Sequence, residues 1–355
     1  MERRQFIQAI SSIFLTTISS CKLSAKNSLS PEITKLESDH FDGERFFNPG
    51  GVNFLNSFSD LLKWRFFRKP IPWEESYAGF KDTPPERVQG ESIRLSYVGH
   101  ATVLLQTEGL NILVDPVWSE KASPVSFAGP ERVTPPGIDM NALPVLDVIL
   151  ITHNHYDHLD LESLKEIYSG QNPRIIVPLG NAHIIKEELP QIHVEEFDWE
   201  ETVPISDSVS LTLQQAFHWS ARGVFDKNKS LWCAYVLETP HGNIYLAGDT
   251  GFNNGEHVIK THDKFGDFRL AVLPIGAYKP RWFMSKQHVN PEEAVKLALM
   301  LGAEQCLGIH LQTFEGLTDE GYDEPVIDLK KALQKHGYQQ DNFKVLIAGQ
   351  HWTIG

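Results

Sequence analysis

The stretch THNHYDHLD, residues 152–160, places three histidines and two aspartates within nine positions. It follows VLDVILI, residues 145–151, whose β-branched and leucine-rich composition is typical of a buried strand. It leads into LDLESLKEIYSG, residues 159–170, where apolar residues recur at helical spacing and Gly170 supplies a stop. The cluster is therefore expected on a strand-to-helix loop at the carboxyl end of a strand, where open α/β sheets place their sites.

These side chains are of the types that bind metal ions. A tight turn can aim His153 and His155 at one point, and Asp157 and His158 at a neighbouring one. Imidazole nitrogens and carboxylate oxygens are good ligands for Zn²⁺, and no cysteine is nearby to complete a closed structural site. A polar loop with chance histidines is the alternative, because short motifs also arise without function. We expect a metal site.

Further ligands must come from elsewhere in the chain, because four ligands on one loop cannot complete two coordination spheres. His218, Asp249 and His310 are the best candidates, since each ends a predicted strand. An aspartate can bridge two cations and screen their mutual repulsion, so Asp249 is the expected bridging ligand. We interpret six of the other histidines as ordinary surface residues: His40, His183, His193, His257, His262 and His336.

The pattern from Ser92 onward predicts an α/β domain. Residues 93–119 read as three consecutive strands, and strands then alternate with helices, among them PEEAVKLALMLG (291–302) and PVIDLKKALQKHG (325–337). Two packed sheets flanked by helices are the natural architecture for such an order. The net charge of −14 argues against a nucleic-acid partner, which would require a basic surface.

The amino terminus has the features of an export signal. Residues 1–21, MERRQFIQAISSIFLTTISSC, combine a basic start with an apolar stretch that is too short to span a bilayer. Arg3 and Arg4 resemble a twin-arginine signal, and ISSC resembles a lipobox in which Cys21 would be acylated. Cleavage elsewhere, or an uncleaved anchor, is the alternative. We expect residues 1–20 to be a signal peptide and the protein to be exported, as a periplasmic protein or a membrane-anchored lipoprotein of a bacterium.

Residues 21–90 are expected to form a linker and an N-terminal extension. The extension carries a basic and aromatic run, formed by Lys63, Arg65, Arg68 and Lys69 with Trp64, Phe66, Phe67 and Trp73. Such a run suits an interfacial helix, because aromatic rings settle among lipid headgroups while cations meet phosphate. An extension packed on the main domain is the alternative, and the sequence leaves both open.

The motifs together resemble a known family. The order HNHYDH, His218, GDT and IH is similar to the metallo-β-lactamase fold superfamily. From about residue 90 to 320, GHATVLL, VDPVWS, HNHYDHLD, AGDTG, IGAYKPRWFM, QHVNPEEAV and IHLQTF resemble the N-acylphosphatidylethanolamine-hydrolysing phospholipase D family. The resemblance implies an αββα four-layer sandwich over residues 91–355. It also implies two zinc ions, one held by His153, His155 and His218, the other by Asp157, His158 and His310, with Asp249 shared.

The implied activity is a zinc-dependent phosphodiesterase that releases N-acylethanolamine and phosphatidic acid, with a hydroxide between the cations as nucleophile. A phospholipid substrate and a membrane surface are the implied partners, and a homodimer is compatible with them. Asp157 and Asp115 match catalytic positions, although Asp115 could instead form a turn, and we favour its supporting a ligand. A lactonase of the same fold, or another metal-dependent hydrolase of a non-lipid ester, is the alternative function.

Gln287, His288 and His100 are three further residues in the motifs of this family. Gln287 and His288 match family positions near the substrate phosphate, but a helix-capping or structural role before Pro291 is the alternative. His100, in GHAT, is interpreted as a hydrogen-bonded structural residue.

Overall fold

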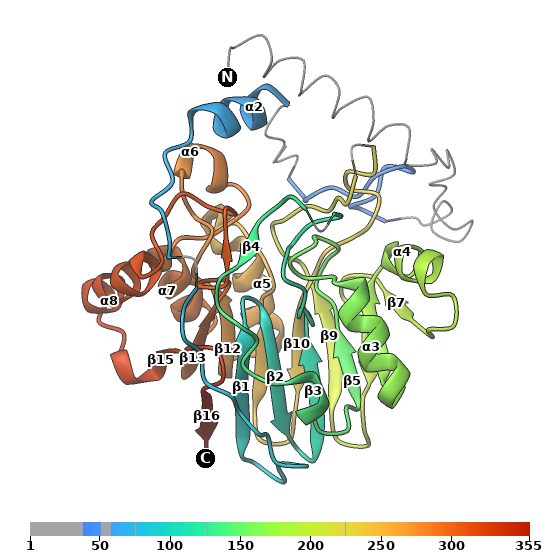
Figure 1. The fold of residues 1–355 in the computed structure, drawn as a ribbon. Coiled ribbons are helices and arrows are strands. Elements are labelled where there is room, and N and C mark those ends of the chain that lie inside the picture. Colours follow the sequence, from blue (N-terminus) through green and yellow to red (C-terminus); the bar gives the residue numbers. More distant parts are fainter. Residues whose placement is uncertain (1–37, 51–57, 75, 126, 224) are drawn as a thin grey trace.

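The computed structural model describes residues 38–50, 58–74, 76–125, 127–223 and 225–355 (Figure 1). The expected signal peptide lies outside these ranges, so its assignment stays a prediction. Within them, every helix is too short or too polar to cross a membrane.

Two large sheets and one small sheet make up the strand framework of the described residues. The first large sheet has the order β16 (His351–Ile354), β1 (Ile93–Gly99), β2 (Thr102–Thr107), β3 (Leu110–Val114), β5 (Val148–Leu150), β6 (Arg174–Pro178) and β7 (Glu195–Phe197). The second has the order β15 (Phe343–Val345), β13 (Gln305–Ile309), β12 (Phe268–Pro274), β11 (Asn243–Leu246), β10 (Ala234–Glu238), β9 (Ser210–Gln214) and β8 (Thr202–Pro204). The small sheet pairs β4 (Glu131–Arg132) with β14 (Phe314–Glu315).

The two-residue period of the strands divides the core into layers. In β2, Val103 and Leu105 join the cluster between the two sheets, whereas Leu104 faces the opposite way and joins a second cluster with Leu164 of α3. That second cluster is closed by α3 (Leu161–Gln171) and α4 (Asn181–Glu188), which cover the outer face of the first sheet (Figure 1).

The outer face of the second sheet is covered by three other helices, α5 (Glu256–Phe265), α7 (Pro291–Met300) and α8 (Glu324–His336) (Figure 1). The result is the expected helix–sheet–sheet–helix sandwich, so the predicted αββα fold is confirmed. Shorter helical segments connect these elements: α6 (Arg281–Met284) and the 3₁₀ turns Met140–Ala142, Asn253–Gly255 and Gln340–Asn342.

Local chemistry sets both ends of α3, the helix that follows the histidine-rich loop of residues 152–160. The side chain of Asp160 accepts a hydrogen bond from the Glu162 amide and so caps the start of α3. The helix ends at Gln171, because Asn172 adopts the left-handed conformation with φ 57°. Gly170 was expected to stop this helix but lies inside it, so that prediction was wrong by two residues.

Part of the expected linker packs on the main domain. Phe41 and Phe46 are buried in the cluster between the sheets. The His40 ring contacts the carboxylate of Asp198 at 2.7 Å, and the Asn48 side-chain amide donates to the main-chain oxygen of His218 at 2.9 Å. This segment therefore braces the loop that carries one of the candidate metal ligands.

Candidate metal centre

The structure brings together all seven side chains that the sequence singled out as ligands. The loop after β5 supplies four of them, and the segments after β9, β11 and β13 supply His218, Asp249 and His310. Because these strand ends meet at one edge of the sandwich, residues separated by up to 157 positions become neighbours.

Three imidazoles form the first group. The Nε2 atom of His153 lies 2.9 Å from Nδ1 of His155, and Nε2 of His218 lies 3.2 Å from that same Nδ1. Oδ2 of Asp249 lies 4.0 Å from Nε2 of His153 and 3.8 Å from Nε2 of His218. The three rings thus converge on one point with a carboxylate beside it.

The second group shares that carboxylate. Oδ2 of Asp157 lies 3.7 Å from Nε2 of His158 and 3.4 Å from Nε2 of His310. Oδ2 of Asp249 lies 3.3 Å and 3.1 Å from the same two nitrogens. Asp249 therefore stands between the two groups, in the place expected of a bridging ligand.

The donor set fits divalent cations. Nε2 of His158, Nε2 of His310 and Oδ1 of Asp249 are buried and have no hydrogen-bond partner among the described residues. Buried polar atoms are normally paired, so three unpaired atoms on residues of one cluster indicate a ligand. Five imidazoles and two carboxylates without a thiolate are a set that suits Zn²⁺ or a similar metal.

The electrostatics leave the first group of histidines neutral. Burial lowers the pKa of His153, of His155 to about 4 and of His218 to about 3. Neutral rings keep a nitrogen lone pair, which is what a metal ion requires.

The second group is dominated by carboxylate charge. Burial alone would raise the pKa values of Asp157 and Asp249, but the surrounding histidines outweigh it and hold both well below the usual range. Burial likewise opposes protonation of His310, yet Asp249 and Asp157 raise its pKa to about 9. The same carboxylates raise the pKa of His158, so this group favours positive charge, which protons supply in the metal-free protein and a bound cation would replace.

Asp115 supports a ligand instead of facing the cluster itself. It is fully buried, and its Oδ2 accepts a hydrogen bond from Nδ1 of His158 at 2.7 Å. The main-chain amide and hydroxyl of Thr152 donate to its two oxygens, each at 2.7 Å. Because Nδ1 of His158 then carries the proton, the Nε2 lone pair is left free toward Asp249.

The two expected substrate residues differ in their placement. Nδ1 of His288 lies 3.6 Å from Oδ2 of Asp249, so this ring belongs to the donor cluster. Gln287 accepts a hydrogen bond from Nδ1 of His218 through its main-chain oxygen at 3.0 Å, while its side chain points to the sulfur of Met284. The helix-capping role considered for Gln287 and His288 belongs instead to Asn290, which caps the start of α7 in a capping box.

Sequence reasoning missed Arg222, which holds the ligand loop from the other side. Its guanidinium donates to the main-chain oxygens of Asn154 at 3.0 Å and Leu159 at 2.7 Å, and it lies over the Tyr156 ring. These contacts clamp both ends of the loop. The only sequence signal was its position four residues after His218.

Two histidines that were interpreted as surface residues are buried. His40 is 5% exposed and stacks on Trp199, and His257 is 1% exposed on the inner face of α5. Neither belongs to a group of possible metal ligands among the described residues.

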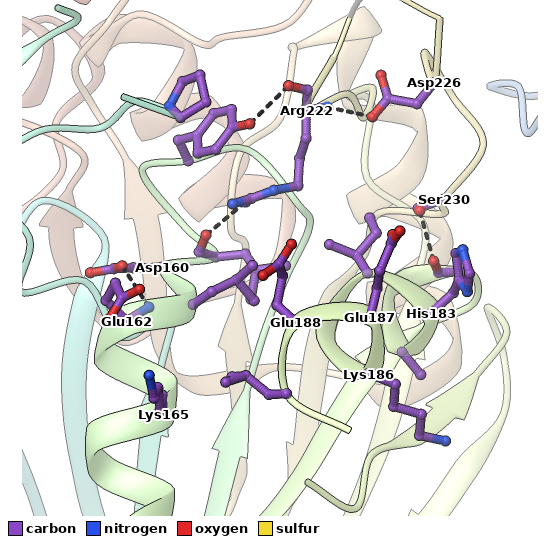
Figure 2. Close-up of a pocket in the computed structure, with 18 of the residues that line it drawn as sticks. Asp160, Glu162, Lys165, His183, Lys186, Glu187, Glu188, Arg222, Asp226 and Ser230 are labelled. Atoms are coloured by element: carbon purple, nitrogen blue, oxygen red, sulfur yellow. Dashed lines mark hydrogen bonds between the residues drawn. The ribbon is translucent and has the colours of Figure 1, made fainter. Parts of the chain in front are cut away.

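A cavity of about 950 Å³ lies between α3 and α4, beside the loop of residues 152–160 (Figure 2). Its walls mix acidic side chains such as Glu187 and Glu188 with basic ones such as Lys165 and Lys186. None of the seven ligand candidates lines it. We therefore locate the functional site by the cluster of buried histidines and aspartates and not by this cavity.

A buried set of histidines and carboxylates at the strand ends of an αββα sandwich defines a metal-dependent hydrolase of the metallo-β-lactamase fold. Residues 110–311 match the family model described as the Beta-lactamase superfamily domain. The chain belongs to this superfamily and, within it, to the N-acylphosphatidylethanolamine-hydrolysing phospholipase D family.

Individual relatives support that placement. The chain is 38% identical to N-acyl-phosphatidylethanolamine-hydrolyzing phospholipase D 1 of Caenorhabditis elegans, over 72% of this chain and 74% of the relative. It is 36% identical to the mitochondrial enzyme of that name from Saccharomyces cerevisiae, over 69% of this chain and 52% of the relative. Among solved structures, Igni18, a metallo hydrolase from Ignicoccus hospitalis, is similar in fold, with a TM-score of 0.55 and 18% identity, over 74% of this chain and 99% of that one.

Proposed function

We propose that this protein is a zinc-dependent phosphodiesterase that binds two zinc ions and hydrolyses phospholipids of the N-acylphosphatidylethanolamine type. One observation carries the proposal: a single oxygen, Oδ2 of Asp249, lies 3.1–4.0 Å from the Nε2 atoms of four buried histidines. One zinc ion would be held by His153, His155 and His218 and the other by Asp157, His158 and His310, with Asp249 bridging them.

Each part of the site has a defined task in this proposal. Two zinc ions, when bound, would supply an activated water and positive charge for the phosphoryl oxygens. Asp115 keeps His158 in the tautomer that leaves Nε2 free, and the Gln287 main chain does the same for His218. In this proposal His288, which is buried at the edge of the cluster, contacts the substrate phosphate.

The names of the relatives supply the substrate class. In the proposed reaction, a water oxygen bonds to phosphorus and the bond from phosphorus to the N-acylethanolamine oxygen breaks. The proton released by the water ends on that leaving oxygen, so the products are N-acylethanolamine and phosphatidic acid. No nucleophilic side chain is required, because the water oxygen attacks phosphorus directly.

A substrate panel tests the assignment. The purified protein, metal-free and then reloaded with zinc, is offered N-acylphosphatidylethanolamine, bis-p-nitrophenyl phosphate and a lactone. We expect zinc-dependent release of N-acylethanolamine, and slower hydrolysis of the small diester. Turnover of the lactone alone would overturn the phosphodiesterase assignment in favour of the lactonase alternative.

We further propose that the substrate is reached at a membrane surface, through exposed apolar side chains of α2 (Phe58–Phe67) and α6. Phe66 and Phe67 are 65% and 78% exposed, and Trp282 of α6 is 47% exposed. Trp64 stacks on Phe283 with ring centroids 5.1 Å apart, which holds α2 against α6 (Figure 1). Large exposed aromatic residues on two neighbouring helices suit contact with lipid.

Arg68, one of the cations of the basic and aromatic run, is not free to meet lipid phosphate. Arg68 is turned inward, donates to Asp319 at 2.8 Å and lies over the Trp64 ring, so it anchors the extension. The informative variant is therefore Phe66→Ser with Phe67→Ser, and Ile327→Ser on α8, 52% exposed, is a matched control. The double variant should lose cosedimentation with anionic vesicles while the control keeps it. Equal binding by all three proteins would rule out this surface.

We also propose that the chain is exported and anchored in a membrane, because residues 1–21 resemble a lipoprotein signal and an anchored protein would lie next to a phospholipid substrate. Replacing Cys21 with serine should abolish metabolic labelling by palmitate. Labelling that survives this replacement would exclude acylation at this residue.

A further inference from the structure

We propose that His100 is a positioning residue of the second metal site, where it fixes the carboxylate of Asp157 and the main chain of His310. This inference rests on the proposed metal centre. It assigns to the GHAT motif a role that the seven ligands do not include.

The side chain of His100 is in direct contact with a ligand. Its Nε2 lies 2.9 Å from Oδ2 of Asp157, and the residue is only 2% exposed. The His100 ring also lies 4.1 Å from the His310 ring and stands edge-on to Phe314 at 5.1 Å. These ring contacts and the burial of His100 restrict rotation of its ring away from the carboxylate.

The main chain of His100 holds the other ligand. Its carbonyl oxygen accepts a hydrogen bond from the His310 amide at 2.7 Å, and its own amide donates to the hydroxyl of Thr313 at 2.7 Å. His100 and His310 have φ values of 57° and 66°, in the left-handed region that residues other than glycine rarely adopt. Paired strain of this kind persists only where the surroundings enforce it, and it is concentrated at functional sites.

The chemistry of the pair gives His100 the role of hydrogen-bond donor. An ionised carboxylate only accepts hydrogen bonds, so the proton of the His100–Asp157 contact must sit on Nε2 of His100. That nitrogen then has no lone pair for a metal ion. His100 nevertheless falls in one group with Asp157, His158 and His310, whose ligand atoms lie within 4.8 Å of one another. Direct ligation by His100 is therefore the rival that an experiment must separate from positioning.

Two substitutions separate them. In His100→Gln, the amide nitrogen has nearly the same reach from the main chain as Nε2 and can still donate to Asp157. His100→Leu has similar bulk and no donor. His100→Asn tolerates the left-handed backbone but is too short to reach the carboxylate, and it replaces the leucine variant should that one not fold. His241→Leu is the control, because His241 also contacts a carboxylate, that of Glu108 at 2.6 Å, but lies in the turn before β11, at the other end of the strand that leads to Asp249.

The readout is zinc binding, measured by competition with a chromophoric chelator and by metal analysis after dialysis. We expect His100→Leu to weaken one of two zinc equivalents by about 10- to 100-fold and to leave the other unchanged, as loss of a ligand's hydrogen-bond partner usually does. His100→Gln should restore the affinity to within about threefold of the original protein, since it keeps the hydrogen bond.

Other results would overturn the inference. If His100 were itself a ligand, glutamine would fail as leucine does. If its role were only to stabilise the fold, His100→Leu would weaken both zinc equivalents alike and lower the urea midpoint. The proposed function fails by a different result, the absence of lipid turnover by the zinc-loaded original protein, so the two failures can be told apart.

Discussion

Replacing Asp115 with asparagine tests how the site prepares its ligands. Asp115 accepts three hydrogen bonds of 2.7 Å, two from Thr152 and one from Nδ1 of His158. Asparagine has almost the same shape but offers one oxygen and one NH₂ group. If the oxygen keeps the Thr152 amide, the NH₂ faces Nδ1 of His158, which must then accept. The His158 proton moves to Nε2, the atom that lies 3.3 Å from Asp249, and the lone pair needed for metal is lost.

The alternative orientation of the asparagine side chain is no better. Its NH₂ group would then face the Thr152 amide, and two buried donors would be left without acceptors at a cost of about 1–3 kcal/mol. We therefore expect the variant to bind the second zinc equivalent about 10- to 100-fold more weakly, which corresponds to about 1.4–2.7 kcal/mol. The first equivalent should be affected less, because His153 meets Asp115 only through the Thr152 hydroxyl.

Isothermal titration of the metal-free proteins with zinc measures both affinities. Asp147→Asn is a matched control, because Asp147 also accepts a main-chain hydrogen bond at 2.7 Å, from Asn111, but lies at the opposite end of the same strand pair. Its zinc binding should not change. Two equivalents of normal affinity in Asp115→Asn would refute the idea that this carboxylate sets the tautomer of His158.

Three further predictions concern stability. Burial lowers the pKa of His40, but hydrogen bonds to Asp198 and Asp39 outweigh it and raise the pKa, so the stabilisation is complete below about pH 6.5 and is lost as the pH rises through the raised value. His40→Gln should therefore cost about 1–2 kcal/mol of unfolding free energy at pH 6 and less at pH 9 in urea titrations, and equal losses would contradict this. A Cβ atom at Gly276 would lie 2.0 Å from the His310 main-chain oxygen, so Gly276→Ala should lower both the melting temperature and zinc affinity, and an unchanged protein would show that the loop yields freely. Gly170→Ala, in open space within α3, should instead stabilise by about 0.5–1 kcal/mol, and a lower melting temperature would count against this.

The predictable part of the fold is the part where pattern and environment agree. Strands such as β5 and β12 are buried on both faces, so their near-continuous apolar runs were readable as strands. The candidate ligands were found because each stands at the end of such a run. His218 and Asp249 could be named for that reason, although either residue alone is weak support for a metal site.

Other elements were not predicted because their signals are local and mixed. In α5, only His257, Val258 and Thr261 are buried, and this narrow stripe lies within polar neighbours. The edge strand β16 is mostly exposed, and its pairing with β1 gives no apolar run to recognise.

Contacts made through the main chain explain the residues that were missed. Arg222 acts on the ligand loop mainly by donating to carbonyl oxygens, and because every residue carries one, the sequence does not single out such a role. The same holds for Phe46, whose burial depends on a loop that lies about 180 positions away, at Asn228. Tertiary contacts of this length are decided by the fold as a whole and not by local composition.

The central claim is that seven side chains hold two metal ions that share Asp249. Anomalous diffraction from zinc-loaded crystals, recorded on both sides of the zinc absorption edge, tests it most directly. We predict two peaks about 3.5–4 Å apart, one within reach of His153, His155 and His218 and the other of Asp157, His158 and His310. A single peak, or peaks away from Asp249, would contradict the claim.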